Sequence, residues 1–191
     1  MRGDGAAAGS DVTIADAQRE VRDVFLNGSV GQLVSGVIWL ASAALGTWGE
    51  KRWAIVALVA GGMFIFPLTQ LVLRLSGRRF ALSAHNPLGY LAMQVAFIVP
   101  LTLPVAGGAA LHNVNWFYPA VMIIVGAHYL PFVFLYGMRE YAVLAGILLG
   151  AGVALGLAMP RTFATGGWLG GAALLAFAAW AAARQETGVQ S

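Results

Sequence analysis

The chain has 191 residues, of which 59% are hydrophobic and 10% are charged, and its mean hydropathy is +0.77. Because soluble domains carry about 25% charged residues, this composition excludes an ordinary soluble protein and predicts a membrane protein. The formal net charge of +3 is spread over the connections, which argues against nucleic acid as a partner, and the absence of cysteine excludes disulfides and thiolate metal sites.

The segment 12–28 predicts a short amphipathic interfacial helix. Thr13 and Asp16 resemble a capping box at its start, and Asn27 with Gly28 supplies a stop signal. Its apolar face consists of four residues at helical spacing: Ile14, Ala17, Val21 and Phe25. The helix lies on the membrane surface or packs against the loops of the remaining protein, and both interpretations stay open here.

Six apolar segments follow, each long enough to cross a hydrocarbon layer of about 30 Å as a helix of about 20 residues. They are Val30–Trp48, Trp53–Leu75, Pro87–Leu111, Trp116–Met138, Tyr141–Met159 and Thr165–Ala183. None has the alternating pattern of a membrane β-barrel strand. The predicted fold class is therefore all-α, a polytopic membrane protein with six transmembrane helices.

These helices are expected to form one transmembrane domain, residues 30–183. A small, polar segment at residues 1–11 predicts a disordered tail, and residues 184–191 predict a cytoplasmic tail. Because the connections are short, consecutive helices are expected to be antiparallel neighbours.

The basic residues predict the orientation in the bilayer. Eight lie on the side of the N-terminus, namely Arg2, Arg19, Arg22, Arg74, Arg78, Arg79, Arg139 and Arg184, and three on the other, namely Lys51, Arg52 and Arg161. The positive-inside rule then places both termini in the cytoplasm. Ten arginines against one lysine indicate a bacterial genome rich in GC, so the expected location is a bacterial inner membrane.

The fourth span contains an ionisable ring near its middle. His128 lies twelve residues into this span, and ionisable groups at that depth usually face the bundle interior or a cavity. Pro131 leaves the carbonyl of Ala127 without its helical N–H donor. His128 is expected either to serve this helix break or to line a polar pocket. The candidate ligand-binding residues are His128, Tyr129, Gln94, Gln70 and Thr69.

A faint internal repeat surrounds the same residues. The second span contains GMFIFP at residues 62–67 and the fourth contains GAHYLP at residues 126–131, and Gln32 and Gln94 lie in the preceding helices. Internal repeats frame midplane binding sites in many transporters, but Gly and Pro are common in any membrane helix. Duplication and chance both remain open.

The acidic residues limit the possible chemistry. All eight lie in tails, loops or helix edges, whereas ion-coupled transport and carboxylate catalysis need an acid within the membrane. The three histidines, His85, His112 and His128, are expected at different depths, too far apart to hold one metal ion. No metal site and no cofactor are therefore predicted.

The last two spans are rich in glycine at small-xxx-small spacing. The glycines are Gly146, Gly150, Gly152 and Gly156, then Gly166, Gly167, Gly170 and Gly171. Such patterns let helices approach closely. They predict either tight packing within one chain or a homodimer.

Four stretches resemble a known family: DAQREVRDVFLNGSVGQLVSGVIWLASAAL, GGMFIFPLTQLVLRL, NPLGYLAMQVAFIVPLTLP and NWFYPAVMIIVGAHYLPFVFLYGM. The chain is similar over about residues 15–158 to small bacterial multi-pass membrane proteins classed as a domain of unknown function. The resemblance implies a compact multi-helix membrane fold and no assigned activity. It leaves the sixth span uncovered.

These observations predict a non-enzymatic module that binds or passively transports a small molecule or lipid. Its midplane pocket is expected from the second, third and fourth spans, around Pro67, Gln94, Pro100, His128 and Pro131. A structural or assembly partner in the membrane is one alternative. The other is an intramembrane enzyme with His128 as general base and Tyr129 assisting, and the sequence leaves the question of an enzyme open.

Overall fold

The computed structural model describes residues 12–78, 81–158 and 161–188, and the predicted tail at residues 1–11 lies outside them. The helices are α1 (Ile14–Phe25), α2 (Ser29–Trp48), α3 (Lys51–Leu75), α4 (Gly89–His112), α5 (Phe117–Tyr136), α6 (Glu140–Ala158) and α7 (Thr165–Gly188), with short 3-10 turns η1 (Leu26–Gly28) and η2 (Val114–Trp116). Six helices are long and apolar enough to span a membrane, and α1 precedes them. The predicted all-α class is confirmed. α7 continues through the first part of the expected C-terminal tail.

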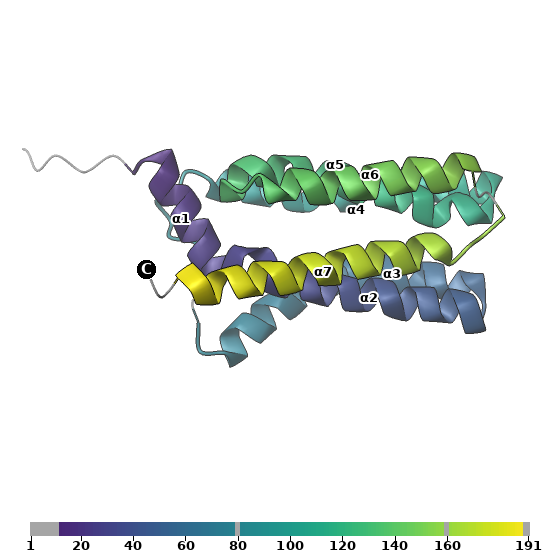
Figure 1. The fold of residues 1–191 in the computed structure, drawn as a ribbon, viewed down its shortest axis with the longest axis horizontal. Helices are drawn as coiled ribbons and strands as arrows, with labels where there is room; N and C mark the ends of the chain where they lie inside the picture. Colours follow the sequence, from purple (N-terminus) through teal and green to yellow (C-terminus); the bar gives the residue numbers. More distant parts are fainter. Residues whose placement is uncertain (1–11, 79–80, 159–160, 189–191) are drawn as a thin grey trace, which may run out of the picture.

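The six long helices form two layers (Figure 1). α2, α3 and α7 form one layer, and α4, α5 and α6 form the other. α7 contacts α5 and α6 and so joins the two. Within the described residues, α3 and α4 do not form a packed pair, so the expectation that all consecutive helices are neighbours is wrong here. The connection between them crosses from one layer to the other.

Glycines set the closest helix contacts. A Cβ added to Gly170 of α7 would overlap the Trp39 ring on α2. On α6, a Cβ at Gly152 would lie 2.9 Å from the carbonyl oxygen of Pro119 on α5. Much of the predicted small-residue pattern therefore packs helices within one chain.

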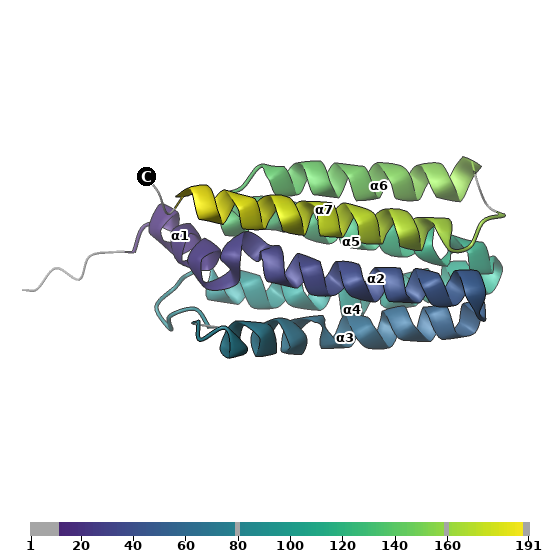
Figure 2. The ribbon, with the colours of Figure 1, turned by 60° about the horizontal axis from the view of Figure 1, so that its bottom comes forward.

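α1 closes one end of the bundle, the end at which α7 terminates (Figures 1 and 2). The Gln18 side chain donates a hydrogen bond to the carbonyl of Phe134 at 2.5 Å. Arg22 donates to the carbonyl of Tyr136 at 2.6 Å. Both acceptors lie in the last turn of α5, where carbonyl groups are open to partners outside the helix. α1 is thus tied to the end of α5.

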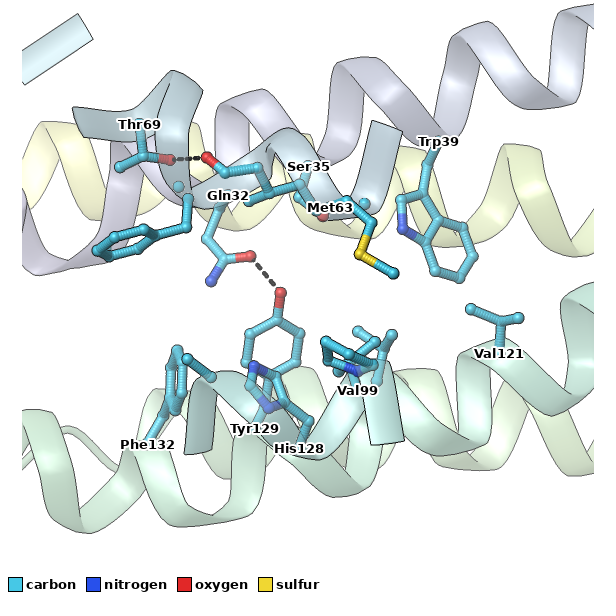
Figure 3. A pocket seen from close by; sticks show the side chains of 18 of the residues that line it. Gln32, Ser35, Trp39, Met63, Thr69, Val99, Val121, His128, Tyr129 and Phe132 are labelled. Carbon is cyan, nitrogen blue, oxygen red and sulfur yellow. Dashed lines mark hydrogen bonds between the residues drawn. The ribbon is translucent and has the colours of Figure 1, made fainter. Parts of the chain in front are cut away.

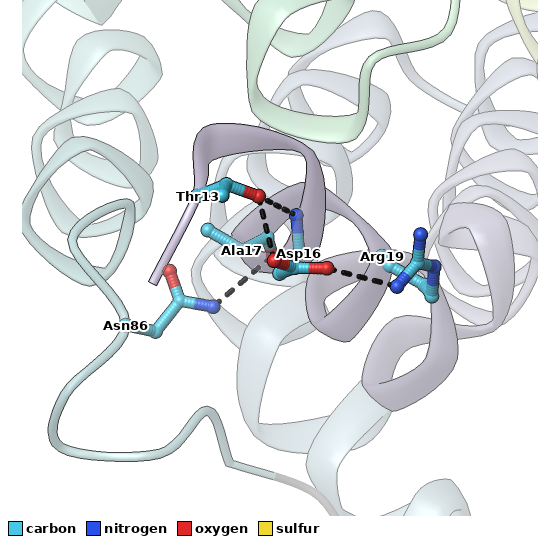
Figure 4. Close-up of polar contacts among 5 residues, drawn as sticks. All are labelled: Thr13, Asp16, Ala17, Arg19 and Asn86. Carbon is cyan, nitrogen blue, oxygen red and sulfur yellow. Dashed lines mark hydrogen bonds and ion pairs between the residues drawn. The ribbon is translucent and has the colours of Figure 1, made fainter. Parts of the chain in front are cut away.

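α1 also holds the connection between α3 and α4. The Glu20 carboxylate accepts hydrogen bonds from the backbone N–H and the hydroxyl of Ser83, at 2.7 and 3.0 Å, and from Nδ2 of Asn86 at 2.8 Å. Asn86 donates in addition to the carbonyl of Ala17 at 3.1 Å, close to the N-terminal cap of α1 (Figure 4). α1 therefore packs on the loops at this end.

Candidate ligand-binding cavity

A cavity of about 270 Å³ lies between α2 and α3 on one side and α4 and α5 on the other. Small-molecule pockets usually measure about 300–1,000 Å³, so the volume fits a small ligand or part of a longer one. Most of the lining is apolar (Figure 3). Its polar side chains include Gln32, Ser35, Thr69, His128, Tyr129 and Tyr136.

The cavity reaches the lipid-facing surface between α3 and α4. On α3, the lining residues Met63 and Phe66 are 56% and 62% exposed, and Gly62 is also exposed. Since α3 and α4 do not form a packed pair in the described structure, little helix packing closes this side. A molecule dissolved in the bilayer can therefore approach the cavity from the hydrocarbon layer.

One hydrogen bond joins the two layers across the cavity. The Tyr129 hydroxyl on α5 donates to Oε1 of Gln32 on α2 at 2.7 Å, and both side chains are buried. The amide nitrogen of Gln32 is turned away from Tyr129 (Figure 3). Ser35, three residues further along α2, lines the same cavity. A hydrogen bond in an apolar site fixes the relative position of the two helices.

His128 lies next to Tyr129 and lines the cavity. Its ring centroid is 5.4 Å from that of Tyr129 and 4.9 Å from that of Phe132, and the ring also interacts with the backbone of Val95 on α4. Its Nδ1 atom is buried and has no hydrogen-bond partner among the described residues. Nδ1 therefore does not bond to the Ala127 carbonyl, which Pro131 leaves without its helical donor.

Thr69 lines the cavity from α3, where its hydroxyl donates to the carbonyl of Ile65 at 2.7 Å. Pro67 lies between them and leaves the carbonyl of Met63 without its usual donor. Prolines of this kind bend helices, and the second half of α3 leans away from the bundle in Figure 1. This bend contributes to the opening beside α4.

The structure brings three of the five predicted site residues together and leaves two outside. His128, Tyr129 and Thr69 line the cavity, whereas Gln70 and Gln94 do not. Gln94 is exposed on α4, although the adjacent residue, Val95, is buried. Successive helical residues differ in direction by about 100°, so one position decides which group faces inward.

Sequence reasoning assigned no site role to α2, although this helix supplies Gln32 and Ser35. The usable signal was Gln32, an amide within an otherwise apolar span. Polar side chains at such positions usually bond to another helix. Pairing Gln32 with Tyr129 required knowledge of which helices face each other.

The cavity contains no formal charge. Among the described residues that line it, none is Asp, Glu, Lys or Arg. Likewise, no three His, Asp or Glu side chains in the described ranges come together to hold a metal ion. The available chemistry is hydrogen bonding by neutral groups and apolar contact.

Comparison with known proteins assigns the chain to a family. Residues 14–184 match DUF7010, a family of unknown function, and the chain belongs to it. The match includes the sixth span, so the resemblance extends beyond residue 158. No curated protein matches the chain, and no solved structure does.

Proposed function

We propose that this member of the DUF7010 family is a non-enzymatic membrane protein that binds, or passively transports, a small molecule or lipid in the cavity between its helix layers. The observation that supports this function is an internal cavity with polar groups on its wall and an opening toward lipid. Gaps between membrane helices that admit a ligand commonly form binding sites.

The enzyme alternative has less support. A general base needs a neighbouring group that orients it and a substrate proton within reach. The His128 ring bonds to the backbone of Val95, a neutral group, and no carboxylate that would stabilise a charged imidazolium lies among the described lining residues. The lack of a carboxylate favours binding over proton transfer.

Trp39 provides a direct measure of cavity occupancy. Its ring lines the cavity but is only 2% exposed, so bilayer lipids do not reach it from outside. We would replace the other five tryptophans, Trp48, Trp53, Trp116, Trp168 and Trp180, with Phe and place the protein in phosphatidylcholine nanodiscs. A long-chain alcohol with a dibrominated chain quenches indole fluorescence on contact. We expect saturable quenching of Trp39.

A matched pair of glycine variants controls this experiment. Gly62 lines the cavity and Gly107 does not, and a Cβ at either would meet no atom within 4 Å. Gly62→Phe should place a ring at the opening and reduce quenching by at least about fivefold, whereas Gly107→Phe should leave quenching unchanged. If Trp39 is not quenched at any probe concentration, the proposed function is wrong.

We also propose that α6 forms a homodimer contact. A Cβ at Gly146 or Gly150 would meet no atom within 4 Å, whereas a Cβ at Gly152 or Gly170 would contact a neighbouring helix. Ala142 and Ala154 are exposed at the same four-residue spacing. Four small residues on one outward stripe would let a second α6 approach closely. A stable dimer in detergent that Gly150→Leu dissociates would support this proposal.

We further propose a bacterial inner-membrane location with both termini in the cytoplasm. The excess of basic residues on the side of α1 supports this orientation. Membrane-impermeant thiol labelling of single-cysteine variants tests it, because the natural chain has no cysteine.

A further inference from the structure

The cavity is polar on one side and apolar on the other. Gln32, Tyr129 and His128 lie together on the side nearer α1, whereas Trp39 and Val121 line the opposite part (Figure 3). A ligand that matches this pattern has one polar group and one apolar body. Neither a wholly apolar nor a wholly polar molecule satisfies both halves.

The lack of charge limits the polar group of the ligand. A buried phosphate, carboxylate or ammonium ion is strongly disfavoured unless an opposite charge pairs with it. Since no Asp, Glu, Lys or Arg is found among the described lining residues, the cavity offers no such partner. The polar group is therefore uncharged.

One unpartnered atom indicates what that group does. Nδ1 of His128 is buried without a partner among the described residues, whereas the Gln32 side chain is already bonded to Tyr129 and Tyr141. The His128 ring also hydrogen-bonds to the backbone of Val95, so Nδ1 is the acceptor of a neutral ring. A ligand hydroxyl would donate to Nδ1, which bare hydrocarbon would leave unpaired.

We propose that the cavity takes an uncharged single-chain amphiphile with one hydroxyl group. The hydroxyl donates to Nδ1 of His128, and the chain extends past Trp39 and leaves between α3 and α4. This inference rests on the proposed function and specifies its ligand class.

Three probes with the same dibrominated chain test the ligand class by quenching of Trp39 in the single-tryptophan protein. They carry a terminal hydroxyl, a terminal sulfate or no polar group. We expect the alcohol to reach half-quenching at about tenfold lower mole fraction in the bilayer than the alkane, as one additional hydrogen bond would give. The sulfate should be weaker than the alcohol by tenfold or more.

Two variants locate the polar group. His128→Phe should remove most of the preference for the alcohol over the alkane. The double variant Gln32→Leu with Tyr129→Phe removes both partners of the bond between these residues and leaves Nδ1 of His128 in place, so it should retain the preference. Circular dichroism and gel filtration confirm folding in each case.

The outcomes separate this inference from the proposed function. If the alcohol reaches half-quenching at the same mole fraction as the alkane, or at the same mole fraction as the sulfate, the ligand class is wrong, while binding in the cavity stands. An alcohol preference that survives His128→Phe, or that is lost only in the double variant, would overturn the placement of the hydroxyl. Failure of all three probes to quench Trp39 would overturn the proposed function as well.

Discussion

At the scale of single residues, His128 and Tyr129 are adjacent in sequence but differ in hydrogen bonding. Nδ1 of His128 has no partner in the described structure, whereas the Tyr129 hydroxyl bonds to Gln32. An unpaired buried polar group costs about 1–3 kcal/mol. His128→Phe in the ligand-free protein removes this cost but also the ring's hydrogen bond to the backbone of Val95, so it is expected to change the free energy of unfolding by less than about 1 kcal/mol.

Tyr129→Phe is the matched control for this prediction. It removes a bonded hydroxyl and leaves the amide oxygen of Gln32 without its donor, so it should lower stability by about 1 kcal/mol. Denaturant titration of both variants in the same detergent makes the comparison. A larger loss for His128→Phe than for Tyr129→Phe would mean that the imidazole holds the fold together.

The same residues show how far the sequence predicts the site. Membrane depth identified His128 and Tyr129, because few ionisable or polar groups lie that deep. Gln94 was misplaced relative to the cavity because α4 is apolar on all sides, and its sequence therefore does not fix its rotation about its axis. Gln32 received no site role because its partner lies 97 residues away, on a helix whose contact with α2 is a tertiary property.

At the scale of helices, length and hydrophobicity predicted all six spans, whereas the lack of close packing between α3 and α4 in the described structure was not predicted, because helix pairing is a tertiary property. The glycine pattern likewise predicted close packing but not which glycines face outward. The structure separates them, since Gly170 contacts Trp39 and Gly150 faces open space. Gly170→Leu should destabilise the protein by about 3 kcal/mol or more through overpacking, while Gly150→Leu should leave unfolding unchanged.

Thermal unfolding of both glycine variants, followed by circular dichroism, checks this contrast. Gel filtration of Gly150→Leu in detergent measures the oligomeric state independently of folding. Equal melting temperatures for Gly170→Leu and the wild type would contradict the close contact between α2 and α7.

One carboxylate makes most of the hydrogen bonds between α1 and the α3–α4 connection. Glu20 accepts hydrogen bonds from two groups of Ser83 and one of Asn86, and bonds to a charged group contribute about 1.5–3 kcal/mol. Glu20→Ala should therefore lower the free energy of unfolding by about 2 kcal/mol. Asp23→Ala removes the same charge from an exposed position on α1 and should change it by less than about 0.5 kcal/mol. Comparable losses in both variants would indicate a general charge effect instead.

At the scale of the whole molecule, an even number of spans places both chain ends on one side of the membrane. Three segments lie together at one end of the bundle, namely α1, the end of α7 and the α3–α4 connection (Figure 2). Because most arginines lie there too, the positive-inside rule predicts that this end faces the cytoplasm. The opposite end carries the α6–α7 connection with Arg161.

Two single-cysteine variants test this orientation. Ala84 and Arg161 are both exposed, and they lie at opposite ends of the bundle. In intact bacterial spheroplasts, a membrane-impermeant maleimide should label Arg161→Cys at once and Ala84→Cys only after permeabilisation. The reverse pattern would invert the orientation, and labelling of both cysteines in intact spheroplasts would contradict a bundle that crosses the membrane six times. Because Arg161→Cys removes a positive charge from the outer side, the substitution strengthens the predicted charge bias and does not compete with it.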